Sequence, residues 1–256
     1  MSQSQNRTLV YLQLILVIVI LALVMIQIMT DGSVLEIFLS TSALLVMFSA
    51  VTMIYCQINP EDTGIGPWRR YSLLLFFAMI LGFVGDLAMP GVLLFPTDIT
   101  LINGILYFGI GHVFYLYALR DRSPLFIDRD RSHGIRTNNL IVWVISIIVI
   151  IILFQLTVYN PAEQIMSFGA LGYGILLITA LAFAMTKWFD DYPIFFKLAI
   201  ILGFLLFFIS DWAIAYKSFQ DSTFLAGTAF VGVTYSLGQL LIQSSTLLGL
   251  KGAKTG

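Results

Sequence analysis

Two aspartates lie within stretches of sequence that otherwise predict membrane-spanning helices. Asp86 falls in Tyr71–Phe95 and Asp211 falls in Pro193–Lys217. An ionisable carboxyl among lipid tails costs at least ~2.5 kcal/mol, so such a residue usually has a function, although it can also serve only to hydrogen-bond two helices together. Two carboxyls in one poorly solvated cavity cannot both ionise easily, and the one that keeps its proton is a usable general acid. Asp86 and Asp211 are therefore the candidate catalytic residues.

The composition of the chain is that of an integral membrane protein. It is 59% hydrophobic with a mean hydropathy of +0.95, and its charged fraction is 11%, against roughly 25% in soluble domains. The apolar runs are continuous and lack the alternation of a membrane barrel, so we predict an all-α polytopic protein, a single transmembrane helical domain over residues 1–256. Eight stretches are long enough to span the bilayer: 8–29, 34–56, 71–95, 98–119, 139–159, 163–187, 193–217 and 222–249.

The basic residues predict the orientation of these helices. If the N-terminus is cytoplasmic, twelve of the thirteen Lys and Arg fall on the cytoplasmic side and only Lys217 falls outside. Cytoplasmic loops carry this excess, so we expect the protein in the cell or cytoplasmic membrane with both termini cytoplasmic. The loop Arg120–Arg136 mixes both signs of charge, which favours a solvated topogenic loop and no nucleic-acid partner.

The two aspartates occupy related positions in the two halves of the chain. They are 125 residues apart, and each follows a Leu-Gly-Phe triplet, Leu81–Phe83 and Leu202–Phe204. Equivalent positions in the two halves are four helices apart. Because an even number of helices preserves the direction through the membrane, this spacing predicts two parallel four-helix repeats. Counted from Leu94 and Lys217, both carboxyls lie ~9–12 Å below the outer edge of the membrane. We therefore expect them to share one cavity.

Further polar residues on two later helices are candidates for substrate binding or for support of the carboxyls. Residues four apart share a helix face, as Asn103 and Tyr107 do, and as Tyr235 and Gln239 do. His112 has two open interpretations: a neutral group that hydrogen-bonds two helices together, or a catalytic or proton-relay residue. Tyr235 and Gln239 can also be explained by hydrogen bonds between helices. The candidates are Asn103, Tyr107, His112, Tyr115, Tyr235 and Gln239. Tyr173, in the sixth predicted helix, is also expected to face the interior.

A metal or a covalent cofactor is not predicted. Asp86, His112 and Asp211 could in principle bind a divalent ion, but no second histidine occurs in any predicted helix, which argues against zinc. Lys217 follows Asp211 by six residues, on the wrong face for a retinal Schiff base paired with that carboxylate. We therefore expect no cofactor and no metal.

The chain resembles the lysoplasmalogenase-like (YhhN) family of integral membrane proteins. Four short motifs in order carry the resemblance: Gly85-Asp86, Gly109–Tyr115 (GIGHVFY), Phe207–Asp211 (FFISD), and Tyr235 with Gln239 (YSLGQ). The resemblance implies hydrolysis of the vinyl ether bond of lysoplasmalogen, which gives a fatty aldehyde and a glycerophospholipid. It also implies that the two intramembrane aspartates, here Asp86 and Asp211, are essential.

The chemistry of that reaction fits a carboxyl pair. A neutral acid protonates the vinyl ether and a carboxylate stabilises the resulting oxocarbenium ion, as carboxyl pairs do in glycosidases. Asp211 has the more apolar flank, which favours it as the acid, with Asp86 as the stabilising carboxylate. The expected partners are a lysophospholipid substrate and membrane lipids, with the oligomeric state open. A proton-coupled transporter and a non-enzymatic lipid-binding protein are the alternatives.

Overall fold

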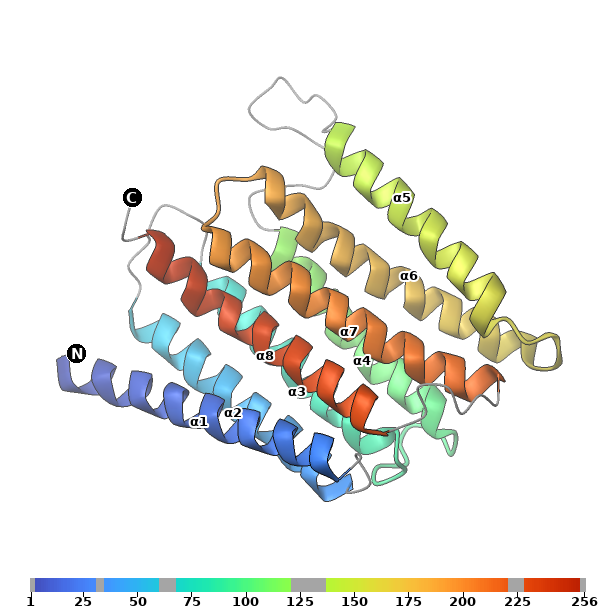
Figure 1. Cartoon of the computed structure of the whole chain (residues 1–256), viewed down its shortest axis with the longest axis horizontal. Helices are drawn as coiled ribbons and strands as arrows, with labels where there is room; N and C mark the ends of the chain where they lie inside the picture. The colour runs from blue at the N-terminus through green and yellow to red at the C-terminus, as the bar shows by residue number, and fades with distance from the viewer. Residues whose placement is uncertain (1–2, 31–34, 60–67, 121–136, 221–227, 254–256) are drawn as a thin grey trace.

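The computed structural model describes residues 3–30, 35–59, 68–120, 137–220 and 228–253, and every regular element within them is helical (Figure 1). Most of the predicted loop Arg120–Arg136 lies outside these residues. Short π and 3₁₀ turns follow α5 and flank α6, at Phe154–Val158, Pro161–Glu163 and Lys187–Phe189. The α-helices are α1 (Gln3–Met29), α2 (Leu35–Ile58), α3 (Trp68–Ala88), α4 (Thr100–Arg120), α5 (Thr137–Leu153), α6 (Gln164–Thr186), α7 (Ile194–Gln220) and α8 (Thr228–Ala253).

The predicted all-α membrane architecture is confirmed. Seven segments that correspond to α1 to α7 are each long and apolar enough to cross a bilayer, and that of α5 includes the π turn that follows it (Thr137–Val158). Helix α8 has 26 residues, about 39 Å of helix, but it is more polar because it carries several Ser, Thr and Gln residues. No described side chain of α8 is exposed, so these polar groups face protein instead of lipid.

The third helix ends earlier than the sequence predicts. The expected helix ran to Phe95, whereas α3 ends at Ala88. Pro90 cannot continue a helix, and Gly91 adopts a φ of +80°, the left-handed conformation that commonly follows a helix end. Asp86 therefore lies two residues before the end of its helix, while α7 continues for nine residues beyond Asp211. A count from the ends of the helices therefore does not support equal depth for the two carboxyls.

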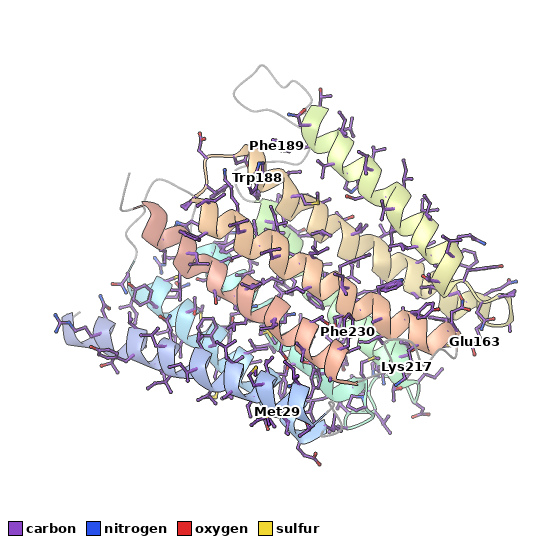
Figure 2. The ribbon with its side chains drawn as sticks, viewed as in Figure 1. Met29, Glu163, Trp188, Phe189, Lys217 and Phe230 are labelled. Atoms are coloured by element: carbon purple, nitrogen blue, oxygen red, sulfur yellow. The ribbon has the colours of Figure 1, made fainter. Side chains whose placement is uncertain are left out.

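The first residues of α1 and the last residues of α8 lie at the same end of the bundle (Figure 1). Figure 2 shows Trp188 and Phe189 toward this end, and Met29, Glu163 and Lys217 at the opposite end. Trp188 and Phe189 are exposed, as is usual for aromatic residues at a membrane–water interface. Lys217 thus lies at the end away from the termini, as the predicted orientation requires; which end is cytoplasmic remains a prediction.

Helix contacts follow the same pattern in the two halves of the chain. In the first half, α1 packs on α2, α2 on α3 and α3 on α4; in the second, α5 packs on α6, α6 on α7 and α7 on α8. Across the halves, α2 packs on α8 and α4 packs on α6. These contacts fit the predicted parallel four-helix repeats, but α1 and α3 also pack on α8, and no equally close contact of α5 or α7 with α4 is found in the described residues. The cross-contacts bring α3 and α7, with their aspartates, into the interior.

Candidate active site

Two hydroxyl groups from neighbouring helices donate hydrogen bonds to the carboxyl of Asp86 on α3. Its carboxyl is 3% exposed and accepts hydrogen bonds from Ser42 on α2 and from Tyr235 on α8, the latter at 2.9 Å. Gly82 lies one turn before Asp86, and a Cβ atom there would be 3.2 Å from the Tyr235 hydroxyl. The small residue at position 82 therefore makes room for the tyrosine to reach the carboxyl.

Asp211 is held by one hydroxyl group and keeps an oxygen free. The Tyr173 hydroxyl of α6 donates to Asp211 Oδ2, while Oδ1 has no hydrogen-bond partner among the described residues. A buried carboxyl oxygen without a partner is costly and invites a ligand or a reacting group. Both donors to Asp86 bind its Oδ2, so each carboxyl has one oxygen outside these hydrogen bonds, and Oδ1 of Asp211 is the one that is buried without a partner among the described residues.

An apolar cavity lies beside Asp211, between α4, α5, α6 and α7. Its volume is about 70 Å³, several times the ~10–15 Å³ that one water molecule needs by the same measure. Aliphatic and aromatic side chains line most of it, and the titratable groups on its wall are Asp211 and the Tyr173 phenol. Such a cavity accommodates hydrocarbon next to a carboxyl.

Phe108 separates Asp86 from this cavity. The Phe108 ring lines the cavity, and a Cβ atom at Gly85, the neighbour of Asp86, would lie 2.9 Å from that ring. Asp86 itself does not line the cavity. The two carboxyls nevertheless lie close enough for their charges to interact.

Aromatic rings bridge the two carboxyls. From the Asp86 side, the Tyr235 ring lies 5.4 Å from Phe207, and Phe207 lies 4.8 Å from His112. His112 lies 5.6 Å from Tyr173, which binds Asp211. The carboxyls are thus two ends of one buried cluster formed by α3, α4, α6, α7 and α8.

The match to a known family covers most of this architecture. The YhhN family matches residues 35–246. The chain belongs to the YhhN family. No curated protein and no solved structure matches the chain. The YhhN region begins with α2, so it contains both aspartates and all three hydroxyl groups that bind them, while α1 lies outside it.

His112, a residue of the GIGHVFY motif of this YhhN protein, is 1% exposed. Its Nδ1 lies 2.8 Å from the Phe108 carbonyl, and because a carbonyl only accepts, Nδ1 must carry the hydrogen. In the neutral ring the other nitrogen, Nε2, is then an acceptor, and it has no partner in the described part of the chain. The structure places this predicted residue between the carboxyls.

Tyr115 and Gln239, also predicted as site residues, bind each other away from the carboxyls. The Tyr115 hydroxyl donates to Gln239 at 2.6 Å and accepts from Gln243 at 3.2 Å. Gln243 also accepts from Ser49 of α2 at 2.7 Å. Hydrogen bonds of this kind hold membrane helices together, and this network joins α2, α4 and α8 beside the aromatic cluster.

Asn103 and Tyr107 lie outside the group of residues that touch the carboxyls. Asn103 is fully buried and binds the segment between α3 and α4, donating to the Thr97 carbonyl at 2.6 Å and accepting from the Thr97 hydroxyl at 2.8 Å. Tyr107 is half-buried, and no described hydrogen bond joins it to Asp86 or Asp211. The early end of α3 creates the segment that Asn103 binds.

Two residues at the carboxyls were not among the predicted site residues. Ser42 and Tyr173 are both direct hydrogen-bond donors, although the sequence analysis gave them no site role. Ser42 and Ser49 are seven residues apart, which places two polar groups on one face of an apolar helix. That spacing was the available signal in α2; Tyr173 had none beyond being a tyrosine in an apolar run.

Asp86, His112 and Asp211 were the candidate ligands for a divalent ion. No three His, Cys, Asp or Glu residues gather as ligands in the described part of the chain, and Asp86, His112 and Asp211 do not form such a group. Two of the four carboxylate oxygens are instead engaged by hydroxyl donors.

Proposed function

We propose that this YhhN protein is a membrane-embedded hydrolase that cleaves the vinyl ether bond of a lysoplasmalogen-type lysophospholipid. The observation that carries the proposal is the free oxygen of Asp211 on the wall of an apolar cavity, with a second buried carboxyl, Asp86, within electrostatic range. The products are a fatty aldehyde and a glycerophospholipid. The family resemblance of the motifs around both aspartates supports the same activity.

The reaction needs no group beyond the two carboxyls and water. Protonated Asp211 donates its proton to the β-carbon of the vinyl ether, and the double-bond electrons form the new C–H bond, which leaves an oxocarbenium ion. Water adds to the cationic carbon and returns a proton to Asp211. The hemiacetal then collapses: its hydroxyl proton passes to the departing oxygen, and an aldehyde and an alcohol are released.

The hydrogen bonds support the division of roles between the carboxyls. Asp86 accepts from two hydroxyl groups and Asp211 from one. Donors stabilise the ionised form of a carboxyl, so the second donor favours Asp86 as the carboxylate. Its negative charge stabilises the oxocarbenium ion, and Asp211, with an oxygen open to the cavity, delivers the proton.

The test is aldehyde release from lysoplasmalogen by the purified protein, with several headgroups. Asp86→Asn and Asp211→Asn preserve size but remove titration, so each should lower turnover by at least ~100-fold, the usual contribution of an acid–base group. Asp98→Asn makes the same change at an exposed position and should leave turnover unchanged. Absence of aldehyde from folded wild-type protein with every headgroup would refute the proposal, and full activity in either buried variant would remove that residue from the mechanism.

One observation favours a proton-coupled carrier as the alternative. Asp86 lies just before the break at Ala88, and broken helices beside buried carboxyls are typical of transporters. Helix α7 continues unbroken past Asp211, so only one half has this feature. Acidification of liposomes that contain the protein, abolished by Asp86→Asn and without aldehyde release, would establish the carrier.

A further inference from the structure

The cavity lies where the two halves of the molecule differ. Repeat symmetry equates α1 with α5 and α8 with α4. Helix α1 packs on α8, whereas α5 does not pack closely on α4 in the residues that the structure describes. Both α4 and α5 nevertheless line the cavity. The second half therefore lacks the close contact that α1 makes with α8 in the first, and α5 stands at the edge of the bundle beside α6 (Figure 1).

Two alanines form the part of the cavity next to the carboxyl. Ala215 lies one turn beyond Asp211 on the same face of α7, and Ala170 lies about one turn from Tyr173 on α6. Their small side chains leave room beside the Asp211–Tyr173 hydrogen bond. Beyond them, Phe154, Val158 and Phe219 pack together and close that end.

The residues that line the cavity extend along two helical segments. They run from Ile150 in α5 to Val158 in the π turn that follows it, and along α7 from Phe208 to Phe219, a length of roughly 12–16 Å at ~1.5 Å per residue. Phe154 and Val158 belong to the π-helical turn, an irregularity that often occurs at functional sites. Trp212 from the cavity wall donates to Thr157 of this turn at 3.0 Å.

We propose that this cavity binds the hydrocarbon chain of a single-chain amphiphile, which enters from the bilayer through the gap between α4 and α5. The proposal deepens the proposed function, and it rests on that function only for the identification of the amphiphile as a lysophospholipid. The apolar lining excludes a polar solute, because polar groups transferred there lose their hydrogen bonds to water. A volume of only about 70 Å³ along this lining suits one chain, and the surrounding bilayer supplies it.

The occupant can be detected through Trp212, because its ring lies on the cavity wall. The probe is a brominated lysophosphatidylcholine in vesicles of unbrominated phosphatidylcholine, since bromine quenches an indole that it contacts. The quenching that belongs to Trp212 is the difference between wild type and Trp212→Phe. This difference excludes the contributions of the exposed Trp188 and of the other indoles. We expect saturable quenching at Trp212 by the single-chain probe. Brominated two-chain phosphatidylcholine should quench Trp212 little, because its second chain does not fit.

Variants that fill the cavity test the site directly. Ala215→Phe places a ring in the cavity from α7, and Ala170→Phe does so from α6, which covers the case in which one of them does not fold. Each should weaken binding of the probe by roughly tenfold or more, the loss expected when about two buried methylene groups are displaced. Leu205→Phe adds bulk to the same helix as Ala215 at a lipid-exposed position and should leave binding unchanged.

Equal quenching of Trp212 by one-chain and two-chain probes would overturn the proposal, because it would mean that the ring only faces bulk lipid. Unchanged binding in the folded alanine variants would overturn it as well. Failure of the proposed hydrolysis is distinguishable, since the probe binds whether or not it is cleaved. Binding without aldehyde release would retain the chain site and reject the enzyme.

Discussion

Asp86 and Asp211 differ in how many hydroxyl groups hold them. Asp86 has two donors, from Ser42 and Tyr235, whereas Asp211 has Tyr173 alone among the described residues. Removal of one donor therefore has unequal consequences at the two sites. Asp86 would keep Ser42, but Asp211 would lose its one described hydrogen bond.

We predict that Tyr173→Phe lowers kcat for aldehyde release by ~10–100-fold, because the Tyr173 hydroxyl stabilises the negative charge that Asp211 gains as it gives up its proton, and one hydrogen bond to a charged group is worth about this much. Tyr235→Phe should cause a smaller loss, because Ser42 still orients Asp86. Tyr117→Phe, an exposed tyrosine on α4, serves as the control and should behave as wild type. A larger loss in Tyr235→Phe than in Tyr173→Phe would contradict the assignment of Asp211 as the proton donor.

The sequence identifies the two aspartates but only one, Tyr235, of the three residues that hold them. A carboxyl in an apolar run stands out because its burial is expensive. Ser42 and Tyr173 do not stand out, since hydroxyl groups are common in membrane helices and cost little there. Tyr235 was found only because it lies one turn from Gln239. The cavity was not predictable, because it depends on how far α5 stands from α4.

At the scale of the helices, small residues set how closely two neighbours approach. The contact between α7 and α8 is formed by Gly203 and Gly238: a Cβ atom at Gly203 would lie 3.0 Å from the Gly238 carbonyl, and one at Gly238 would lie 2.9 Å from the Gly203 carbonyl. In the other half, a Cβ atom at Gly111 would lie 3.2 Å from the Ala78 carbonyl of α3. Close approach of backbones is how membrane helices gain packing energy.

We predict that Gly203→Val destabilises the protein by ~1–3 kcal/mol, the usual cost of overpacking. The added side chain must displace either Ile242 or the α8 backbone, and the backbone cannot yield without separating the helices. Gly172→Val is the matched control, because no atom lies within 4 Å of a Cβ there. The measurement is thermal unfolding in detergent. Equal midpoints for the two variants would show that α7 and α8 are not held by this contact.

The sequence predicts most helices well because lipid demands continuous apolar runs. The boundary that it misplaces is the end of α3, where Val92, Leu94 and Phe95 are apolar but exposed and non-helical. Pro90-Gly91 carries the stop signal, and apolar residues beyond it masked that signal. Helix α8 illustrates the opposite case: it is less apolar than the other helices because protein surrounds it.

At the scale of the whole molecule, the even number of helices places both ends of the chain on one side. Helices α2, α4, α6 and α8 then all run in one direction and α1, α3, α5 and α7 in the other (Figure 1). Among the described basic residues, Arg69, Arg70, Arg120 and Lys197 lie near the end that carries the termini, and Lys217 lies near the other. The distribution of charge therefore gives the bundle a direction in the membrane.

We predict that a reporter inserted after Thr30 or after Pro161 is extracytoplasmic, and that one after Glu61 or after Asp128 is cytoplasmic. The measurement is labelling of the reporter in intact cells by a reagent that does not cross the membrane. An internal reporter at Pro161 together with an external one at Thr30 would contradict the eight-helix architecture, because both sites lie at the end away from the termini. A complete reversal at all four sites would keep the fold but invert the bundle. The cavity beside Asp211 lies toward the Lys217 end of α7. In the predicted orientation the lipid therefore enters the cavity from the outer leaflet, and in the inverted orientation it would enter from the inner leaflet.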